Sequence, residues 1–190
     1  MDTRLDEEQL VRQFEALVLP HLDAAYSLAR WLTLNTQDAE DLAQMAYVRA
    51  YRFFPGFQGG DARSWLLTIV RHTYFTSLRD HKHEQHDIAY DEAEHADAGE
   101  DAYLSASSYD DSVNPEIIAA RQDAKNIVNR ALEQLPQRFR EIVVLKEIED
   151  LSYKEIAEIV GIPLGTVMSR LARGRKLLLE TLKSAGEGGV

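Results

Sequence analysis

SYKEIAEIVGIPLGTVMSRLARGRKLL, residues 152–178, carries the marks of a helix, a turn and a second helix in direct succession. Ser152 and Glu155 have the spacing of a capping box, in which each side chain accepts a hydrogen bond from the other residue's backbone amide. Gly161 stands where helices commonly end in a left-handed glycine. Pro163 suits the first turn of the next helix, because its missing N–H would have no partner there. The order predicts a helix-turn-helix.

The second of these helices separates a polar face from an apolar stripe. At about 100° per residue, its hydroxyls and most of its cations fall on one side with no carboxylate to neutralise them. The apolar stripe can pack on the preceding helices, and Arg175 lies on the flank. The polar face contains Thr166, Ser169, Arg170, Arg173 and Lys176, and the stripe contains Leu164, Val167, Leu171, Gly174 and Leu178.

Two interpretations of this polar face are open. Cations are often only a solvated surface, but the helix dipole disfavours them early in a helix, where Arg170 stands. The stronger interpretation is a helix laid in the major groove of DNA. There, Arg binds guanine edges and phosphates, and Ser or Thr binds phosphates or either base.

The net charge of −11 does not exclude a polyanionic partner, because it is unevenly distributed. Residues 84–112 hold ten Asp and Glu and no Lys or Arg, so they contribute −10 of the total. Attraction to phosphates depends on local clusters of charge rather than on the sum. The stretch lacks an apolar period, and we expect a flexible acidic linker over 84–114 between domains at 1–83 and 115–190. It is either a spacer or a competitor of DNA for a basic face.

Apolar residues on both sides of the linker recur at helical spacing, and no convincing strand-type alternation is present. We therefore expect an all-α protein of two small helical domains. The sequence has no run of about 18 apolar residues and no signal-peptide pattern, so we expect no membrane insertion and a cytoplasmic location. The chain has no cysteine, which excludes disulfides and thiolate metal sites.

The expected helices of the first half lie between Phe14 and Leu32, from Thr36 to about Phe54, and from about Ala62 to His81. Thr36 is the expected N-cap of the second, with carboxylates in the first turns where the dipole favours them. PGFQGGD, residues 55–61, interrupts the pattern. In the second half, helices are expected over about 115–135 and 137–149.

Two surfaces of the first half suggest partners. Residues 62–82 hold four basic residues against one acid, interleaved with aromatic residues. Cations can follow the phosphates of a single strand while rings stack on its bases, although a core role for Trp65 is the other interpretation. The helix over 38–54 begins with acids and has a mixed face suited to a protein partner.

Three segments in order resemble regions 2 and 4 of bacterial sigma-70-type initiation factors, specifically the small extracytoplasmic-function (ECF) group. The resemblance covers roughly residues 10–82 and 115–182, and it is more specific than a helix-turn-helix alone. The segments are DAEDLAQMAYVRAYRFF (38–54), FQGGDARSWLLTIVRHTYFTSLR (57–79) and ALEQLPQRFREIVVLKEIEDLSYKEIAEIVGIPLGTVMSRLARGRKLL (131–178).

The resemblance implies a role for each segment. The first would bind the clamp helices of the largest RNA polymerase subunit through Asp38, Asp41, Leu42 and Gln44. The second would open the minus-10 promoter element and capture a flipped base, with the loop of residues 58–62 as the pocket; its expected contacts are Phe57, Gln58, Arg63, Trp65, Arg71 and Arg79. The last helix would read the minus-35 element as duplex through Thr166, Ser169, Arg170, Arg173 and Lys176.

The resemblance also implies the partners. They are core RNA polymerase (the clamp helices, and the flap of the second largest subunit), promoter DNA and an anti-sigma factor. The factor itself makes or breaks no bond, so we expect neither an enzyme nor a cofactor.

The chain departs from the family's pattern at several positions. His72 and Thr76 stand where Asn and Asp are common, and no role is assigned to them. Met168 stands where Lys is common, which removes one possible phosphate contact. Gly174 stands where Ala is common, at a cost of about 1 kcal/mol of helix preference.

Two other functions are compatible with parts of the sequence. A helix-turn-helix regulator with an unrelated N-terminal domain would explain the second half, but not the acidic-start helix and the basic, aromatic segment after it. A metal enzyme would use His81, His83, His86 and His95. However, HEQH lacks the HExxH spacing that puts two imidazoles on one helical face, so no metal site is expected.

Overall fold

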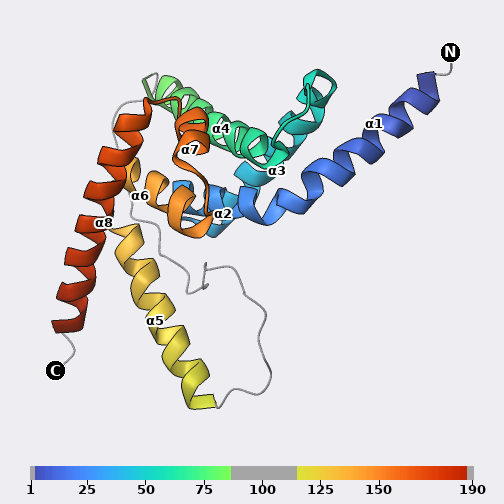
Figure 1. Ribbon diagram of the computed structural model, residues 1–190. Helices are drawn as coiled ribbons and strands as arrows, with labels where there is room; N and C mark the ends of the chain where they lie inside the picture. The colour runs from blue at the N-terminus through green and yellow to red at the C-terminus, as the bar shows by residue number, and fades with distance from the viewer. Residues whose placement is uncertain (1–2, 87–114, 188–190) are drawn as a thin grey trace. The chain divides into compact units, whose positions relative to one another are not determined.

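The computed structural model describes residues 3–86 and 115–187, with side chains over 8–80 and 122–184. The chain divides into two compact units, residues 1–98 and 99–190, and each is described separately. The described residues form helices and no strand, which confirms the all-α prediction (Figure 1). Within the described residues, no helix is long and apolar enough to span a membrane.

The first unit is built around three helices, α2, α3 and α4, that pack against one another. Small residues on α3 let its neighbours approach closely, since Ala39, Ala46 and Ala50 are all fully buried. Trp31, Leu66 and Leu67 fill the space between the helices. The elements are α1 (Thr3–Val18), a 3-10 turn (Leu19–His21), α2 (Leu22–Thr33), α3 (Thr36–Phe53), a second 3-10 turn (Phe54–Gly56) and α4 (Ala62–His86).

The start of α3 differs from the prediction by one residue. Asn35, not Thr36, is the N-cap, and its Oδ1 accepts a hydrogen bond of 3.0 Å from the amide of Asp38. Asn35 is extended because α2 ends in a left-handed residue, Leu34, with a φ of 57°. The reversal of the chain there places the Asn35 side chain over the free amides of the helix.

The second unit contains the predicted helix-turn-helix. Its elements are α5 (Pro115–Glu133), α6 (Gln137–Val143), a π-helical turn (Val144–Ile148), α7 (Tyr153–Val160) and α8 (Leu164–Glu187). The predicted helix over 137–149 is thus α6 followed by the π turn. Its core is formed by α6, α7 and α8, with Ile142, Ile156 and Val167 fully buried.

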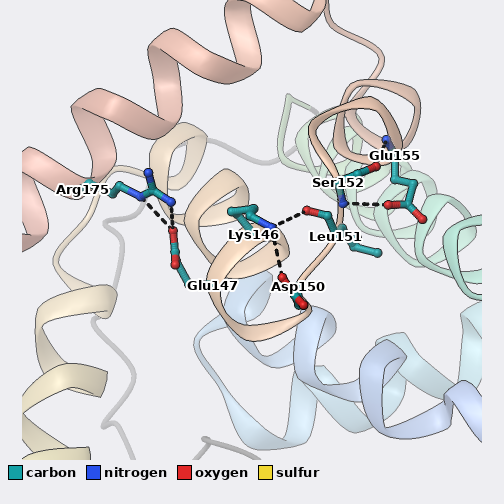
Figure 2. A network of polar contacts seen from close by, with 7 residues as sticks. All are labelled: Lys146, Glu147, Asp150, Leu151, Ser152, Glu155 and Arg175. Carbon is teal, nitrogen blue, oxygen red and sulfur yellow. Dashed lines mark hydrogen bonds and ion pairs between the residues drawn. The ribbon is translucent and has the colours of Figure 1, made fainter.

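The local predictions for α7 and its turn are confirmed. The Ser152 amide donates to Glu155 Oε2 at 2.7 Å, and the Glu155 amide donates to Ser152 Oγ at 3.3 Å, which completes the capping box (Figure 2). Gly161 ends α7 with a φ of 71°. The carbonyl of Pro163 then accepts hydrogen bonds from the Thr166 and Val167 amides, at 2.8 and 3.1 Å, at the start of α8.

Helices α6 and α8 pack closely at Gly174. A Cβ atom on this residue would lie 2.7 Å from Cγ2 of Val143 and 3.4 Å from Cβ of Phe139. Real Cβ atoms essentially never come that near another atom, so either the methyl group or a helix would have to move. Gly174 lowers the intrinsic stability of α8 as a helix, but it permits the close contact between α6 and α8.

Helix α4 continues five residues beyond the predicted end, to His86, so residues 84–86 of the predicted linker are helical. The rest of the linker, 87–114, lies outside the described residues. So do His95 and the side chains of His81, His83 and His86. Among the side chains that are described, no group of three or more His, Asp or Glu could hold a metal ion. The expectation about a metal at the histidine cluster stays a prediction.

Candidate nucleic-acid interface

The outer surface of α8 carries the predicted polar face. Ser169, Arg173 and Lys176 are exposed, and Thr166 and Arg170 are half-buried at its edge. The opposite side of the helix is fixed in the core, since Val167 is 0% and Leu171 is 2% exposed. The fold therefore turns all five predicted side chains away from the centre of the unit.

Two arginines of this face are available to a ligand. Within the described part of the chain, the side chains of Arg170 and Arg173 form no hydrogen bond or ion pair. Lys176 differs, because its Nζ lies 3.9 Å from Glu180 Oε1, so the expectation that no carboxylate accompanies the cations is wrong there. Ser169 Oγ donates to the Thr166 carbonyl at 3.1 Å and keeps its lone pairs for another donor.

Arg175 is held by the π turn instead. Its Nη2 and Nε donate to Glu147 Oε1 at 2.6 and 2.8 Å, and these hydrogen bonds raise the pKa of Arg175 (Figure 2). In the same turn, Lys146 Nζ donates to Asp150 Oδ1 at 3.0 Å and to the Leu151 carbonyl at 3.1 Å. This network links the π turn to α8 and to Leu151, two residues before α7. It was not predicted, because Glu147 and Arg175 are 28 residues apart.

The apolar stripe of α8 is shorter than predicted. Leu164 is 49% exposed rather than packed in the core. The residue stands at the first position of the helix, one turn before Val167 and two turns before Leu171, which make the core contacts. Met168, which was not assigned to either face, is 52% exposed.

The predicted minus-10 surface begins at the loop between α3 and α4. Gly59 and Gly60 have φ values of 87° and 102°, which only glycine adopts at no cost, and Gln58 is exposed beside them. Asp61 ends the loop by capping α4: Oδ1 accepts from the Arg63 amide and Oδ2 from the Ser64 amide, both at 3.1 Å. Ser64 Oγ also donates to Oδ2.

The charge of Asp61 is stabilised by these contacts. Partial burial acts to raise the pKa of the carboxyl group, but the hydrogen bonds from Ser64 and Arg63 outweigh it and leave the pKa below its usual value. The cap thus fixes both the start of α4 and the end of the glycine loop.

Phe57 and Trp65 lie together at the base of the loop. Their ring centroids are 4.9 Å apart, and Phe54 stacks on Phe57 at 5.8 Å. Phe57 and Trp65 are half-buried, whereas Phe54 belongs to the core. Trp65 therefore packs on the core and keeps an accessible part beside the loop, and its contact with an unpaired base stays a prediction.

The predicted cations of α4 do not share one face. At about 100° per residue, Arg71, Phe75 and Arg79 follow one side of the helix, and Arg63 lies about a third of a turn from Phe75. The Arg71 guanidinium lies 4.6 Å from the centroid of the Phe75 ring. Phe75 was not among the predicted contacts, although its position four residues after Arg71 could have indicated the pair.

Of the predicted polymerase contacts on α3, Asp38, Asp41 and Gln44 are exposed. Leu42 is 3% exposed and packs in the core, so its assignment as a direct contact is wrong. Met45 and Val48, which were not among the predicted contacts, are 45% and 60% exposed and stand one and two turns after Asp41. The free side of α3 thus joins carboxylates to apolar side chains.

Comparison with known proteins matches both units to one family. Residues 17–84 match the family described as Sigma-70 region 2, and residues 125–178 match Sigma-70, region 4. The ECF RNA polymerase sigma factor SigW of Bacillus subtilis is 32% identical over 90% of this chain and 89% of its own. The chain belongs to the ECF group of the sigma-70 family.

Other relatives agree. The RNA polymerase sigma-H factor of Pseudomonas aeruginosa is 31% identical to this ECF factor, over 96% of this chain and 97% of its own. The ECF factor SigE of Mycolicibacterium smegmatis is 32% identical over 93% of this chain, which spans 64% of that longer relative. This ECF factor is therefore a sigma factor that directs transcription initiation. The alternative, a regulator with an unrelated N-terminal domain, is not favoured, because the first unit matches region 2.

Solved structures show the same fold. The sigma factor RpoE of Bartonella quintana, crystallised with the anti-sigma factor NepR, aligns with a TM-score of 0.67 at 25% identity over 90% of this chain and 98% of its own. CnrH, solved with the cytosolic domain of CnrY, aligns with a TM-score of 0.59 at 22% identity, over 91% of this chain and 89% of its own.

Proposed function

We propose that this ECF sigma factor divides promoter recognition between its units. The second unit reads the minus-35 element as duplex with α8, and the first unit opens the minus-10 element. The observation that carries this is a pair of arginines, Arg170 and Arg173, that have no partner within the described residues and lie on the outer surface of a helix held by a capped helix-turn-helix. Thr166, Ser169 and Lys176 supply further donors to bases and phosphates.

The first unit binds core RNA polymerase through α3. Asp38, Asp41 and Gln44 supply the polar contacts to the clamp helices of the largest subunit, and Met45 and Val48 supply apolar area beside them. Leu42 keeps α3 on the core and acts only by positioning. The second unit contacts the flap of the second largest subunit.

The glycine loop and α4 hold the opened strand. Gln58 and the free edges of Phe57 and Trp65 contact the flipped base, while Arg71 and Arg79 follow the backbone beside Phe75; Arg63 acts from the other flank. Stacking of one base on an aromatic ring contributes about 1–3 kcal/mol, so two such contacts offset the few kcal/mol needed to unstack a base. Binding energy alone opens the strands, so the factor is not an enzyme and uses no cofactor.

The remaining partner is an anti-sigma factor, because the structural relative from Bartonella quintana was solved with one. The site of action is the cytoplasm, where bacterial core RNA polymerase works.

The test of this division compares arginines of α8 that have no partner within the described residues with Arg175, which is paired with Glu147. Holoenzyme reconstituted with the full chain would first select a promoter from a randomised library by run-off transcription. Arg173→Ala should then weaken recognition of the selected minus-35 element by about 10-fold to 100-fold, because a bidentate base contact is worth about 1–3 kcal/mol. Arg170→Ala should act in the same direction. Arg175→Ala, whose side chain is already paired, should change recognition less than about twofold.

Binding to core polymerase is measured in parallel. All three α8 variants should bind it normally, whereas Asp41→Ala should weaken it and leave the contact of α8 with duplex unchanged. Loss of core binding in Arg170→Ala, or equal defects in Arg173→Ala and Arg175→Ala, would contradict the proposed division.

A further inference from the structure

An apolar strip runs along α8 beside its cations. Leu164, Met168 and Ala172 follow one another at intervals of four residues and are all exposed, Leu164 by 49% and Met168 by 52%. Ser169 and Arg173 stand next to Met168 and Ala172 in the sequence and are exposed as well. An exposed methionine among residues that contact phosphates and bases needs a different kind of partner, because a thioether forms only weak hydrogen bonds.

The geometry of the helix places Met168 and Arg170 on opposite flanks of the outward side of α8, with Arg173 between them. Buried Val167, Leu171 and Gly174 mark the side of α8 that faces the core. Measured from the opposite, outward direction at about 100° per residue, Ala172 and Arg173 lie about 50° away, Met168 about 90° and Arg170 about 110°. A groove that receives Arg170 on one flank of α8 therefore receives Met168 on the other.

The chemistry of the major groove restricts what Met168 can recognise there. Three of the four bases present only hydrogen-bond donors and acceptors at their groove edges, whereas thymine adds a C5-methyl group. An apolar side chain gains by covering that methyl group. The three rotatable bonds of methionine let it adapt to the position of the methyl group.

We infer that Met168, with Ala172 beside it, reads the C5-methyl group of a thymine in the minus-35 element and is a specificity-determining residue of this sigma factor. The inference rests on the proposed function, because it requires α8 to lie in the major groove. The strip would otherwise be a contact for a protein partner. DNA is favoured because Arg173, which stands next to Ala172, is a cation with no partner within the described residues.

The test removes single methyl groups from the DNA. Each thymine of the minus-35 duplex selected by the wild-type holoenzyme is replaced in turn by deoxyuridine, which lacks only the C5-methyl group. At one position the wild type should lose affinity about fourfold, the worth of one buried methyl group. The Met168→Ala holoenzyme should show no loss at that position, and Met168→Leu should retain it. Met168→Lys should lose the methyl effect and bind with a steeper salt dependence, by about one counterion.

The outcomes separate this inference from the proposed function. If the wild-type holoenzyme selects no minus-35 sequence, or Arg173→Ala leaves selection unchanged, the proposed function fails and the inference with it. Two other outcomes would overturn only the inference, with promoter selection normal. Either no deoxyuridine lowers the affinity of the wild type, or the loss of affinity is equal in Met168→Ala. The apolar strip would then be a contact for a protein partner. Met168 is half exposed, so its variants should fold normally. An unchanged melting temperature of each variant would exclude misfolding as the cause of a change in DNA affinity.

Discussion

Gly174 shows how a residue that weakens a helix can stabilise a fold. Alanine in its place would gain about 1 kcal/mol of helix preference. The new methyl group would also lie 2.7 Å from a buried, β-branched valine that has one preferred rotamer in a helix. The glycine therefore carries a packing role in the second unit that composition and propensity do not reveal.

We predict that Gly174→Ala lowers the free energy of unfolding of the second unit by about 0.5–2 kcal/mol, because overpacking of a core costs about 1–3 kcal/mol and the gain in helix preference offsets part of it. Gly165→Ala is the matched control on the same helix. Apart from its chain neighbours and its own helix backbone, nothing lies within 4 Å of the Cβ it would add, so it should be neutral or slightly stabilising.

Urea unfolding followed by circular dichroism would report these changes. Both tryptophans of the chain, Trp31 and Trp65, lie in the first unit, so their fluorescence transition should not move. Equal effects of Gly174→Ala and Gly165→Ala on the free energy of unfolding would show that the close approach of α6 and α8 does not affect stability.

At the scale of the elements, α7 and its turn could be predicted in detail because all their determinants are local. Capping box, C-terminal glycine and proline are read from adjacent positions and need no tertiary contact. The N-cap of α3 could not be assigned in the same way. Asn35 and Thr36 are both suitable caps, and the left-handed Leu34 decides between them.

The side-chain roles were less predictable than the helices. Periodicity places Leu42 on α3 but does not show that this side of the helix faces α2 and α4. The stripe on α8 included Leu164, because periodicity does not show where the neighbouring helices end. The π turn and the pair of Glu147 with Arg175 depend on contacts between distant residues, which no local pattern contains.

The cap of α4 gives a prediction with a pH dependence. The pKa of Asp61 is lower in the folded chain than in the unfolded one, so the unfolded state binds more protons in acid. Its stabilisation is therefore present above the unfolded pKa of about 3.9 and is lost as the pH falls through the folded pKa. We predict that Asp61→Ala costs about 1 kcal/mol of unfolding free energy at pH 7 and that this difference shrinks below about pH 4.

Tryptophan fluorescence during urea unfolding would measure this difference, since both tryptophans lie in the same unit as Asp61. Asp61→Asn is the control, because asparagine caps helices as well as aspartate does but does not titrate. The explanation fails if Asn is as damaging as Ala at pH 7, or if the difference between wild type and Asp61→Ala is the same at pH 3 and pH 7.

At the scale of the whole molecule, the charge is concentrated in the stretch of sequence that joins α4 to α5. The ten acidic residues within 84–112 account for almost the entire net charge of −11. Their charge repels polyanions such as DNA. This repulsion is screened beyond about 10 Å at 0.1 M salt.

We predict that replacing these ten residues by Asn and Gln raises the affinity of the free protein for duplex DNA at low salt and that the gain disappears at high salt. Fluorescence anisotropy at two salt concentrations would measure it. A variant with the same residues in shuffled order keeps the charge and should bind like the wild type. Identical binding of the neutral and shuffled variants would mean that the linker is only a spacer.

The π turn restricts the insertions and deletions that the chain can accept at this point. Its bond from the Glu149 amide to the Val144 carbonyl, 3.1 Å long, spans five residues rather than four. Deleting one residue between Val144 and Ile148 would restore an ordinary helical turn with bonds that span four residues. The side chains within the turn, Glu147 among them, would then change their positions relative to α8, although the core of α6 would be unchanged. Natural insertions and deletions should therefore be rarer here than in an exposed loop, because a change of one residue alters the contact between the π turn and α8.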